Sequence, residues 1–297
     1  MTRSKGYIFV LLAAAGWSFM GLFNRILASD GVDLSTTLVI RNTGSFLLLT
    51  ILFLIFKRSV FRINLRHLPL FLCSGVISVF GLGVTYFACQ RQCSLAVAAT
   101  LLYLAPAFVV IAAAILWKTP ITLRRGMALV LSLAGCALVS GVIGGEITAS
   151  ASGILLGIAS GLCYASYTVF AHYALKHYDS YTMIYWTFAV AGCAAMFLFD
   201  GQSMAQVASA SETVFCALGL VVISTVLPYL LYTRGLMYLE SGKAAVASNA
   251  EPVLAALIGI FIFAEIPTLW TVLGFLMVLT GVLVLAMERQ TAEKKEA

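Results

Sequence analysis

Long apolar segments separated by short polar links dominate the chain. A helix rises about 1.5 Å per residue, so roughly 20 apolar residues cross a hydrocarbon core about 30 Å thick. The pattern predicts ten membrane-spanning helices, at Gly6–Ala28, Leu34–Phe56, Leu68–Cys89, Leu95–Trp117, Gly126–Gly144, Gly153–Leu175, Tyr181–Phe199, Thr213–Leu239, Ala244–Ala264 and Leu269–Met287. A barrel would need alternating segments of about 10 residues, so we predict an all-α, polytopic membrane protein.

Composition narrows the classes of function. The 297 residues are 62% hydrophobic and 10% charged, with a mean hydropathy of +1.02. Soluble domains are about 45–50% apolar and about 25% charged. The predicted helices use most of the chain, so we expect no separate catalytic or nucleic-acid-binding domain. The seven cysteines are scattered without the spacing of a zinc site or a disulfide framework, and we predict no metal and no cofactor.

The basic residues predict how the chain is oriented. With the N-terminus in the cytoplasm, most of the eighteen basic residues fall on that side, namely Arg3, Lys5, Lys57, Arg58, Arg62, Arg66, Lys118, Arg124, Arg125, Lys176, Lys243, Arg289, Lys294 and Lys295. The outer loops then hold the acidic residues Asp30, Asp33, Glu146, Asp200 and Glu212. The positive-inside rule therefore predicts that both termini are cytoplasmic. The net charge of +6 reflects this topology and contact with anionic lipid.

An internal repeat divides the chain. A shift of about 146 residues brings similar residues together: Gly6 near Gly153, Trp17 near Tyr164, Phe23 near Phe170, Tyr86 onto Tyr232, Pro106 onto Pro252 and Gly135 onto Gly281. This predicts two five-helix halves, residues 1–146 and 147–297. Because five is odd, the second half enters the membrane from the opposite side, which is an architecture typical of transporters that work by alternating access.

These features together resemble the ten-helix EamA-like family of the drug/metabolite transporter superfamily over nearly the whole chain. The matching features are Trp17, Arg41, Tyr86 leading into Ala96–Pro106, Tyr232, Gly242–Pro252, Ala264–Glu265 and Gly274–Gly281. The resemblance implies movement of amino acids, related metabolites or drugs, often outward. The first half departs from the pattern, since Thr119 stands opposite Glu265 and Ala105 opposite Glu251, which puts strict symmetry of an ion site in doubt.

Glu251 is the leading candidate for a functional side chain. A charged group near the middle of the bilayer costs about 2.5–3.5 kcal/mol, so it is expected to face the bundle interior or a cavity. Pro252 follows directly, and its missing N–H leaves a helical carbonyl free to bind. Glu251 could exchange a proton or contact a substrate amine. Alternatively it is a structural partner of an arginine or lies at the level of the lipid headgroups.

Polar and aromatic residues could line a binding pocket beside Glu251. Ser248 and Asn249 lie on the same predicted helix, and Tyr103 is the repeat equivalent of Asn249. Four aromatic residues occupy symmetric places and suit an amphipathic solute or an ammonium group through cation–π contact: Trp17, Tyr86, Tyr164 and Tyr232. Packing between helices is the alternative for each of these residues.

The remaining ionisable residues within the helices are assigned by depth. Arg25 and Arg41 are expected near the outer surface, where their long side chains can reach the headgroups. His172 and Arg234 lie nearer the cytoplasmic ends and are candidates for a gate, or for solvated positions.

The sequence therefore favours a transporter that moves a small polar or amphipathic metabolite, in the export direction. A proton gradient would drive it if Glu251 titrates, and the substrate gradient alone would drive it otherwise. We expect a monomer in a bacterial inner membrane, although Lys294–Lys295 resembles a dilysine signal of the endoplasmic reticulum. We predict no enzyme, because the three histidines are dispersed without a metal-binding motif. A lipid-handling protein or scaffold is the alternative, and a groove open to lipid would distinguish it.

Overall fold

The computed structural model describes residues 2–93, 95–139, 150–263 and 266–287. These residues form helices and short connections and contain no strand, in agreement with the predicted all-α class. Some residues named above lie outside the described ranges: Glu146, Ala264, Glu265, Arg289, Lys294 and Lys295. The boundary expected between residues 146 and 147 lies outside them as well.

Eight helical segments of the described chain are long and apolar enough to cross a membrane, and each matches a predicted segment within a few residues. They are Ser4–Ser29, Leu34–Phe56, Leu65–Gln90, Val97–Leu116, Ala151–Ala174, Ser180–Leu198, Ser211–Leu236 and Ser241–Ile262. Two further helices correspond to the remaining predicted segments: α8 (Leu123–Val139) overlaps the fifth, and α16 (Leu269–Met287) coincides with the tenth.

Several spans consist of more than one regular helix. The elements are α1 (Thr2–Ser18), α2 (Met20–Ser29), α3 (Leu34–Phe56), α4 (Leu68–Cys73), α5 (Leu82–Gln90), α6 (Leu95–Leu102), α7 (Ala105–Leu116), α9 (Ala151–Ala174), α10 (Ser180–Ala195), α11 (Gly201–Ser209), α12 (Ser211–Val221), α13 (Leu227–Leu236), α14 (Ser241–Ser248) and α15 (Glu251–Phe263). Three 3₁₀ turns, at Arg58–Phe61, Leu65–His67 and Met196–Leu198, flank the helices. Hydropathy did not predict the surface helix α11.

Two spans are interrupted at equivalent positions of the repeat. The helix pair α6 and α7 breaks at Tyr103 and Leu104, just before Pro106, and the pair α14 and α15 breaks at Asn249, shortly before Pro252. Proline has no N–H and clashes with the preceding turn, so a helix tends to stop or bend there. These prolines account for both breaks.

Two other spans contain π-helical turns, again at equivalent positions. The segment Ser74–Gly81 joins α4 to α5, and the segment Val222–Val226 joins α12 to α13. A π-helical turn is rare and is often found where a functional site requires it. Periodicity in the sequence did not signal these turns, because one extra residue per turn hardly changes an almost uniformly apolar pattern.

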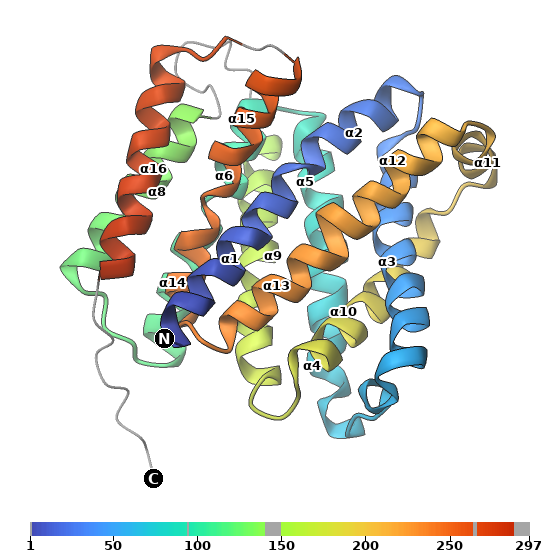
Figure 1. The fold of residues 1–297 in the computed structure, drawn as a ribbon, viewed down its shortest axis with the longest axis horizontal. Helices are drawn as coiled ribbons and strands as arrows, with labels where there is room; N and C mark the ends of the chain where they lie inside the picture. The colour runs from blue at the N-terminus through green and yellow to red at the C-terminus, as the bar shows by residue number, and fades with distance from the viewer. Residues whose placement is uncertain (1, 94, 140–149, 264–265, 288–297) are drawn as a thin grey trace.

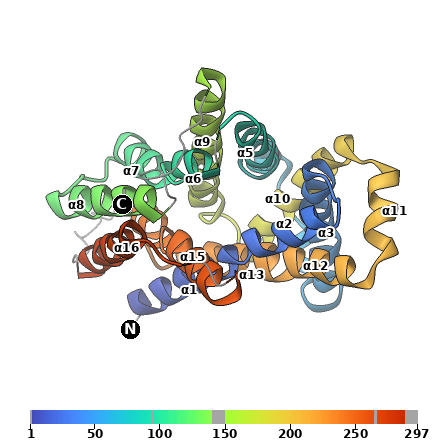
Figure 2. The same ribbon diagram turned by 90° about the horizontal axis from the view of Figure 1, so that it is seen from above.

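The helices form one bundle with distinct edges. The pair α8 and α16 lies at one edge, and α3, α12 and α11 lie at the other (Figures 1 and 2). Between them, α1 packs along α13, α5 along α9, and α3 along α10. Trp17, Phe71, Phe188 and Tyr229 belong to the large buried cluster at the centre of this packing.

The contact between α8 and α16 is the most extensive of these helix pairings. A Cβ atom added to Gly274 would lie 2.7 Å from the Gly135 carbonyl oxygen, and one added to Gly281 would lie 2.8 Å from the Ala128 carbonyl oxygen. Helices in lipid associate through van der Waals packing, and small residues let their backbones approach. The glycines therefore determine the distance between these two helices.

An ion pair joins α3 to α10 at one end of the bundle. Lys57, which ends α3, donates to Asp179, the residue that caps the N-terminus of α10. Burial by itself would raise the pKa of Asp179. Hydrogen bonds from Lys57 and Thr182 outweigh that effect and leave the pKa of this carboxyl below its ordinary value.

Candidate functional site

A small pocket contains the leading candidate, Glu251, and is called the Glu251 pocket here. Its space is about 60 Å³, well below the roughly 300–1,000 Å³ of ligand sites. It therefore has room for only a small group in this conformation. The lining residues are Trp17, Met20, Asn24, Arg41, Leu82, Gly83, Tyr86, Phe87, Leu102, Tyr164, Tyr229 and Glu251.

Glu251 sits in the pocket because α15 begins at this residue, directly after the break in its span. Its carboxylate interacts with the hydroxyl groups of Tyr103 and Tyr164 and with the charge of Arg41. The position at the headgroups that the sequence left open for Glu251 is thus wrong. Glu251 faces the bundle interior, among aromatic residues from both halves of the sequence.

The expected position of Arg41 at the lipid headgroups is also wrong. Arg41 is only 6% exposed and lines the Glu251 pocket. Its side chain also interacts with Tyr229. The position of a residue along its helix does not determine which face of the helix points inward. An arginine inside the bundle is stable only with partners, and a carboxylate is the strongest of these.

Polar atoms in this pocket lack protein partners. Within the described residues, the Asn24 side-chain oxygen and the Arg41 Nε are buried without a hydrogen-bond partner. Buried polar groups are normally satisfied by protein or water, and exceptions call for an explanation. A polar ligand or an ordered water in the pocket would satisfy both atoms.

Three of the four predicted aromatic residues meet in the Glu251 pocket: Trp17, Tyr86 and Tyr164. Trp17 packs edge-on against Tyr164 and Tyr229, with ring centroids 6.0 and 5.5 Å apart. The fourth predicted residue, Tyr232, is buried behind Trp17, at a centroid distance of 5.3 Å, and does not line the pocket. Tyr229 takes that place.

The predicted polar residues near the helix breaks lie just behind the pocket. Tyr103 reaches Glu251 from the break between α6 and α7. Ser248 is buried and donates to the Ala245 carbonyl oxygen at 2.8 Å, and it also interacts with the Tyr164 hydroxyl. Asn249 is buried at the other break, and its side-chain nitrogen has no partner among the described residues.

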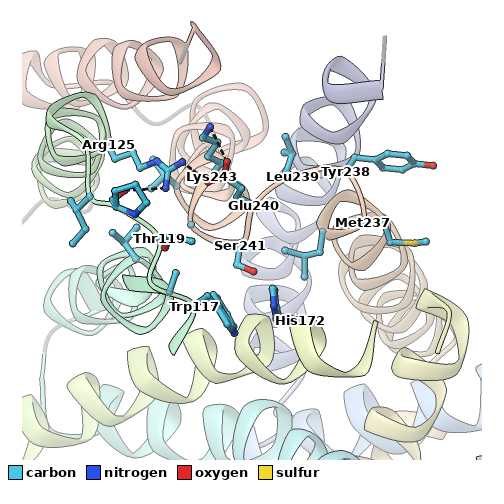
Figure 3. Close-up of a pocket in the computed structure, with 17 residues that line it drawn as sticks. Trp117, Thr119, Arg125, His172, Met237, Tyr238, Leu239, Glu240, Ser241 and Lys243 are labelled. Carbon is cyan, nitrogen blue, oxygen red and sulfur yellow. Dashed lines mark hydrogen bonds and ion pairs between the residues drawn. The ribbon is translucent and has the colours of Figure 1, made fainter. Parts of the chain in front are cut away.

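A second, larger cavity of about 250 Å³ lies toward the opposite end of the bundle, and we call it the Lys243 cavity. The helices α7, α8, α9, α13 and α14 surround it (Figure 3). Three of its charged residues form a cluster: Arg125 donates to one Glu240 carboxylate oxygen, and the Lys243 Nζ lies 3.4 Å from the other. The sequence indicated none of these three as a site residue. It did offer one signal, since Glu240 and Lys243 lie one helical turn apart.

The two gate candidates are not brought together. His172 lines the Lys243 cavity and stacks on Trp117, with centroids 3.9 Å apart. Arg234 is exposed, donates to the Tyr181 hydroxyl at 3.0 Å and lies over the Phe9 ring. Only His172 therefore faces a cavity.

A buried layer separates the Glu251 pocket from the Lys243 cavity. Along α9, Tyr164 lines the first and His172 the second, eight residues apart, so Thr168 lies midway between them. Thr168 shares a hydrogen bond of 2.9 Å with the Tyr232 hydroxyl. The four residues of helix on each side of Thr168 span about 6 Å. The layer is thus about two turns thick and carries a polar contact at its centre.

Fold and site define an integral membrane protein whose polar side chains lie at two depths of one helical bundle, as in polytopic transporters. The family model "EamA-like transporter family" matches residues 4–141 and 151–287. The chain belongs to this family of membrane transporters, in agreement with the resemblance noted from the sequence.

Relatives and a solved structure agree with this assignment. An "Uncharacterized transporter" of Archaeoglobus fulgidus is 31% identical over 67% of this chain and 70% of its own length. The "Uncharacterized inner membrane transporter YicL" of Salmonella typhimurium is 25% identical over 96% of both chains. A crystal structure with a TM-score of 0.78 and 20% identity covers 95% of this chain and 96% of its own, which shows a shared fold.

Proposed function

We infer that this protein carries a small amphipathic metabolite that bears an amine, such as an amino acid or a related compound, in the export direction. The observation that carries this inference is the Glu251 pocket. In it a carboxylate surrounded by aromatic rings lies near the buried Arg41. Such a pocket would bind an ammonium group through charge and cation–π contact. Arg41 would hold a carboxylate of the same solute.

Several features support two inverted five-helix halves and a total of ten membrane-spanning helices. The family model matches twice, once in each half of the chain. The proline breaks and the π-helical segments recur about 146 residues apart. Packing is also exchanged between the halves, since α1 packs on α13 while its repeat equivalent, α9, packs on α5. A pseudo-two-fold axis in the membrane plane relates halves of this kind.

The two cavities and the layer between them support alternating access. The Lys243 cavity is about 250 Å³, which approaches the size of a ligand site, whereas the Glu251 pocket is only about 60 Å³. The excess of basic residues at the end of the bundle with the Lys243 cavity supports a cytoplasmic location for that end. With that orientation the larger cavity would face the cytoplasm, and export would begin from this side.

Uptake into proteoliposomes tests the function. Purified protein would be reconstituted and offered radiolabelled amino acids and cationic amphipathic drugs at several imposed pH gradients. Glu251→Gln keeps the size and polarity of the side chain but removes its charge. We expect it to lower flux of the transported solute at least tenfold and to abolish any dependence on the pH gradient. Glu212→Gln, at an exposed position, serves as the matched control and is expected to transport normally.

The outcomes separate binding from proton coupling. If Glu251→Gln loses only the pH dependence, the carboxylate carries protons. If it loses affinity for amines without affecting neutral analogues, the carboxylate binds the solute. Normal transport by Glu251→Gln at every gradient would contradict the role given to this residue. Flux equal to that of protein-free liposomes would contradict transport of the tested solutes.

A further inference from the structure

Two buried polar atoms of the Glu251 pocket have no hydrogen-bond partner within the described part of the chain. They are the side-chain oxygen of Asn24 and the Nε of Arg41. The proposed function assigns Arg41 to a solute carboxylate and gives Asn24 no role. An amide oxygen only accepts hydrogen bonds, and a guanidinium nitrogen only donates them. A solute that satisfies both atoms therefore offers a donor to Asn24 and an acceptor to Arg41.

The helix α2 directs Asn24 toward the pocket. It begins at Met20, after the first span breaks at Phe19. Met20 and Asn24 lie four residues apart, on one face of this helix, and both line the pocket. Glu251 lines the same small space from a span of the other half of the chain. The amide oxygen and the carboxylate are thus two acceptors on the wall of one pocket.

Two acceptors in one small pocket distinguish between kinds of amine. A primary ammonium group carries three N–H donors, so it can donate to Glu251 and to Asn24 at once. A trimethylammonium group has the same charge and the same attraction to aromatic rings but no N–H. It would leave the Asn24 oxygen buried and unpaired, and such a group is costly. Charge and aromatic contact do not separate these two cations, whereas Asn24 does.

We propose that Asn24 is a specificity-determining residue that accepts one N–H of the solute's ammonium group, while Glu251 accepts another. The pocket then selects amines with at least two N–H groups over dimethylated and trimethylated amines. This inference rests on the proposed function, because it concerns the same ammonium group. It adds a limit on the substrate class that charge and cation–π contact do not impose.

Binding of a methylation series to the purified protein in detergent tests the proposal without any gradient. The probes are leucine and phenylalanine, each with zero, one, two or three methyl groups on its nitrogen, measured by calorimetry. Every member keeps the positive charge, and each step adds one methyl group and removes one N–H. Because two acceptors require two N–H groups, we expect the dimethyl form to bind at least tenfold more weakly than the monomethyl form. A smaller ratio with both amino acids would overturn the proposal.

Variants of Asn24 should move this step in the series. Asn24→Leu has nearly the same shape without the amide, so its monomethyl and dimethyl ligands should bind within threefold of each other. The loss should then appear at the trimethyl form, which cannot donate to Glu251. Asn24→Asp keeps an acceptor and should keep the tenfold ratio. Gln202→Leu removes an exposed amide on α11 and is the matched control, expected to bind as wild type does.

The variants also decide whether water satisfies Asn24. A ratio above threefold in a folded Asn24→Leu protein would contradict the role of Asn24 and would indicate that only water pairs with its oxygen. If Asn24→Leu does not fold, Asn24→Ala removes the same acceptor and should give the same ratio below threefold. Loss of the ratio in a folded Asn24→Asp protein would also contradict the proposal.

The failures of the two proposals can be told apart. Equal flux of the monomethyl and dimethyl forms into proteoliposomes would support transport and overturn the role of Asn24. A tenfold step in binding without flux of any member would contradict transport and support the role of Asn24. If no member binds and none is transported, both proposals fail.

Discussion

The glycine contact between α8 and α16 yields the sharpest quantitative expectation. In Gly274→Ala, the new Cβ would lie 2.7 Å from the Gly135 carbonyl oxygen and 2.8 Å from a Val139 methyl group. Real Cβ contacts stay above 3.0 Å. The helices must therefore separate by at least 0.3 Å, the difference between 3.0 Å and the 2.7 Å contact with the Gly135 oxygen. Backbone atoms cannot turn away as a side chain would. Overpacking of this kind costs about 1–3 kcal/mol.

A matched variant on α8 isolates the steric cost. Gly126 has no atom within 4 Å of its added Cβ, so Gly126→Ala gains helix propensity, about 0.8–1.0 kcal/mol, without a clash. Both variants share the gain of an alanine in a helix. The difference between their free energies of unfolding therefore reports the clash, and we expect Gly274→Ala to be less stable than Gly126→Ala by about 1–3 kcal/mol.

Thermal unfolding in detergent, followed by tryptophan fluorescence, measures this difference. Each kcal/mol corresponds to roughly 2–4 °C in a protein of 150–250 residues, so we expect the two melting temperatures to differ by roughly 2–12 °C. Equal melting temperatures would refute the reasoning, because they would show that the two helices separate at no cost.

Three further expectations concern other contacts. Thr168→Val leaves the buried Tyr232 hydroxyl without its partner, so it should cost about 1–3 kcal/mol in the same assay, and the double variant with Tyr232→Phe should cost less. Asp179→Ala should lose about 1 kcal/mol of helix capping that Asp179→Asn retains. Because the pKa of Asp179 is lowered in the folded protein, its ion pair stabilises above about pH 4 and is lost as the pH falls further, which acid unfolding of wild type and Asp179→Asn would reveal. Arg234→Gln, at an exposed position, should change flux less than twofold, and a larger loss would restore Arg234 as a gate residue.

The spans could be predicted because their length depends on membrane thickness and their polarity on lipid contact. The predicted segment Leu34–Phe56 coincides with α3, and the others shift by a few residues. The breaks at Asn249 and Tyr103 were within reach of the same reasoning, since Pro252 and Pro106 follow them closely. The π-helical turns were not, because hydropathy does not depend on the hydrogen-bonding pattern of the backbone.

The positions of charged residues were harder to predict, for one physical reason. Hydropathy gives the depth of a residue in the membrane but not the direction in which its side chain points, and direction comes from packing between helices. Arg41 was therefore assigned to the headgroups, whereas it lies 6% exposed in the Glu251 pocket. Lys243 was counted among the cytoplasmic charges that set topology, although its side chain is buried in a cavity.

The difference between the depth of a residue and the direction of its side chain matters when a basic residue near a helix terminus is used to predict topology. A lysine that only sets topology lies in water or among headgroups. Its removal weakens the charge bias that orients the chain in the membrane but breaks no specific contact. Lys243 lies one turn after Glu240 and interacts with the Glu240 carboxylate. Arg125, from another helix, interacts with the same carboxylate. A basic residue that pairs with the residue preceding its own helix, and through it is linked to another helix, is constrained by packing. The spacing of Glu240 and Lys243 was visible in the sequence, whereas the approach of Arg125, 115 positions away, required the fold.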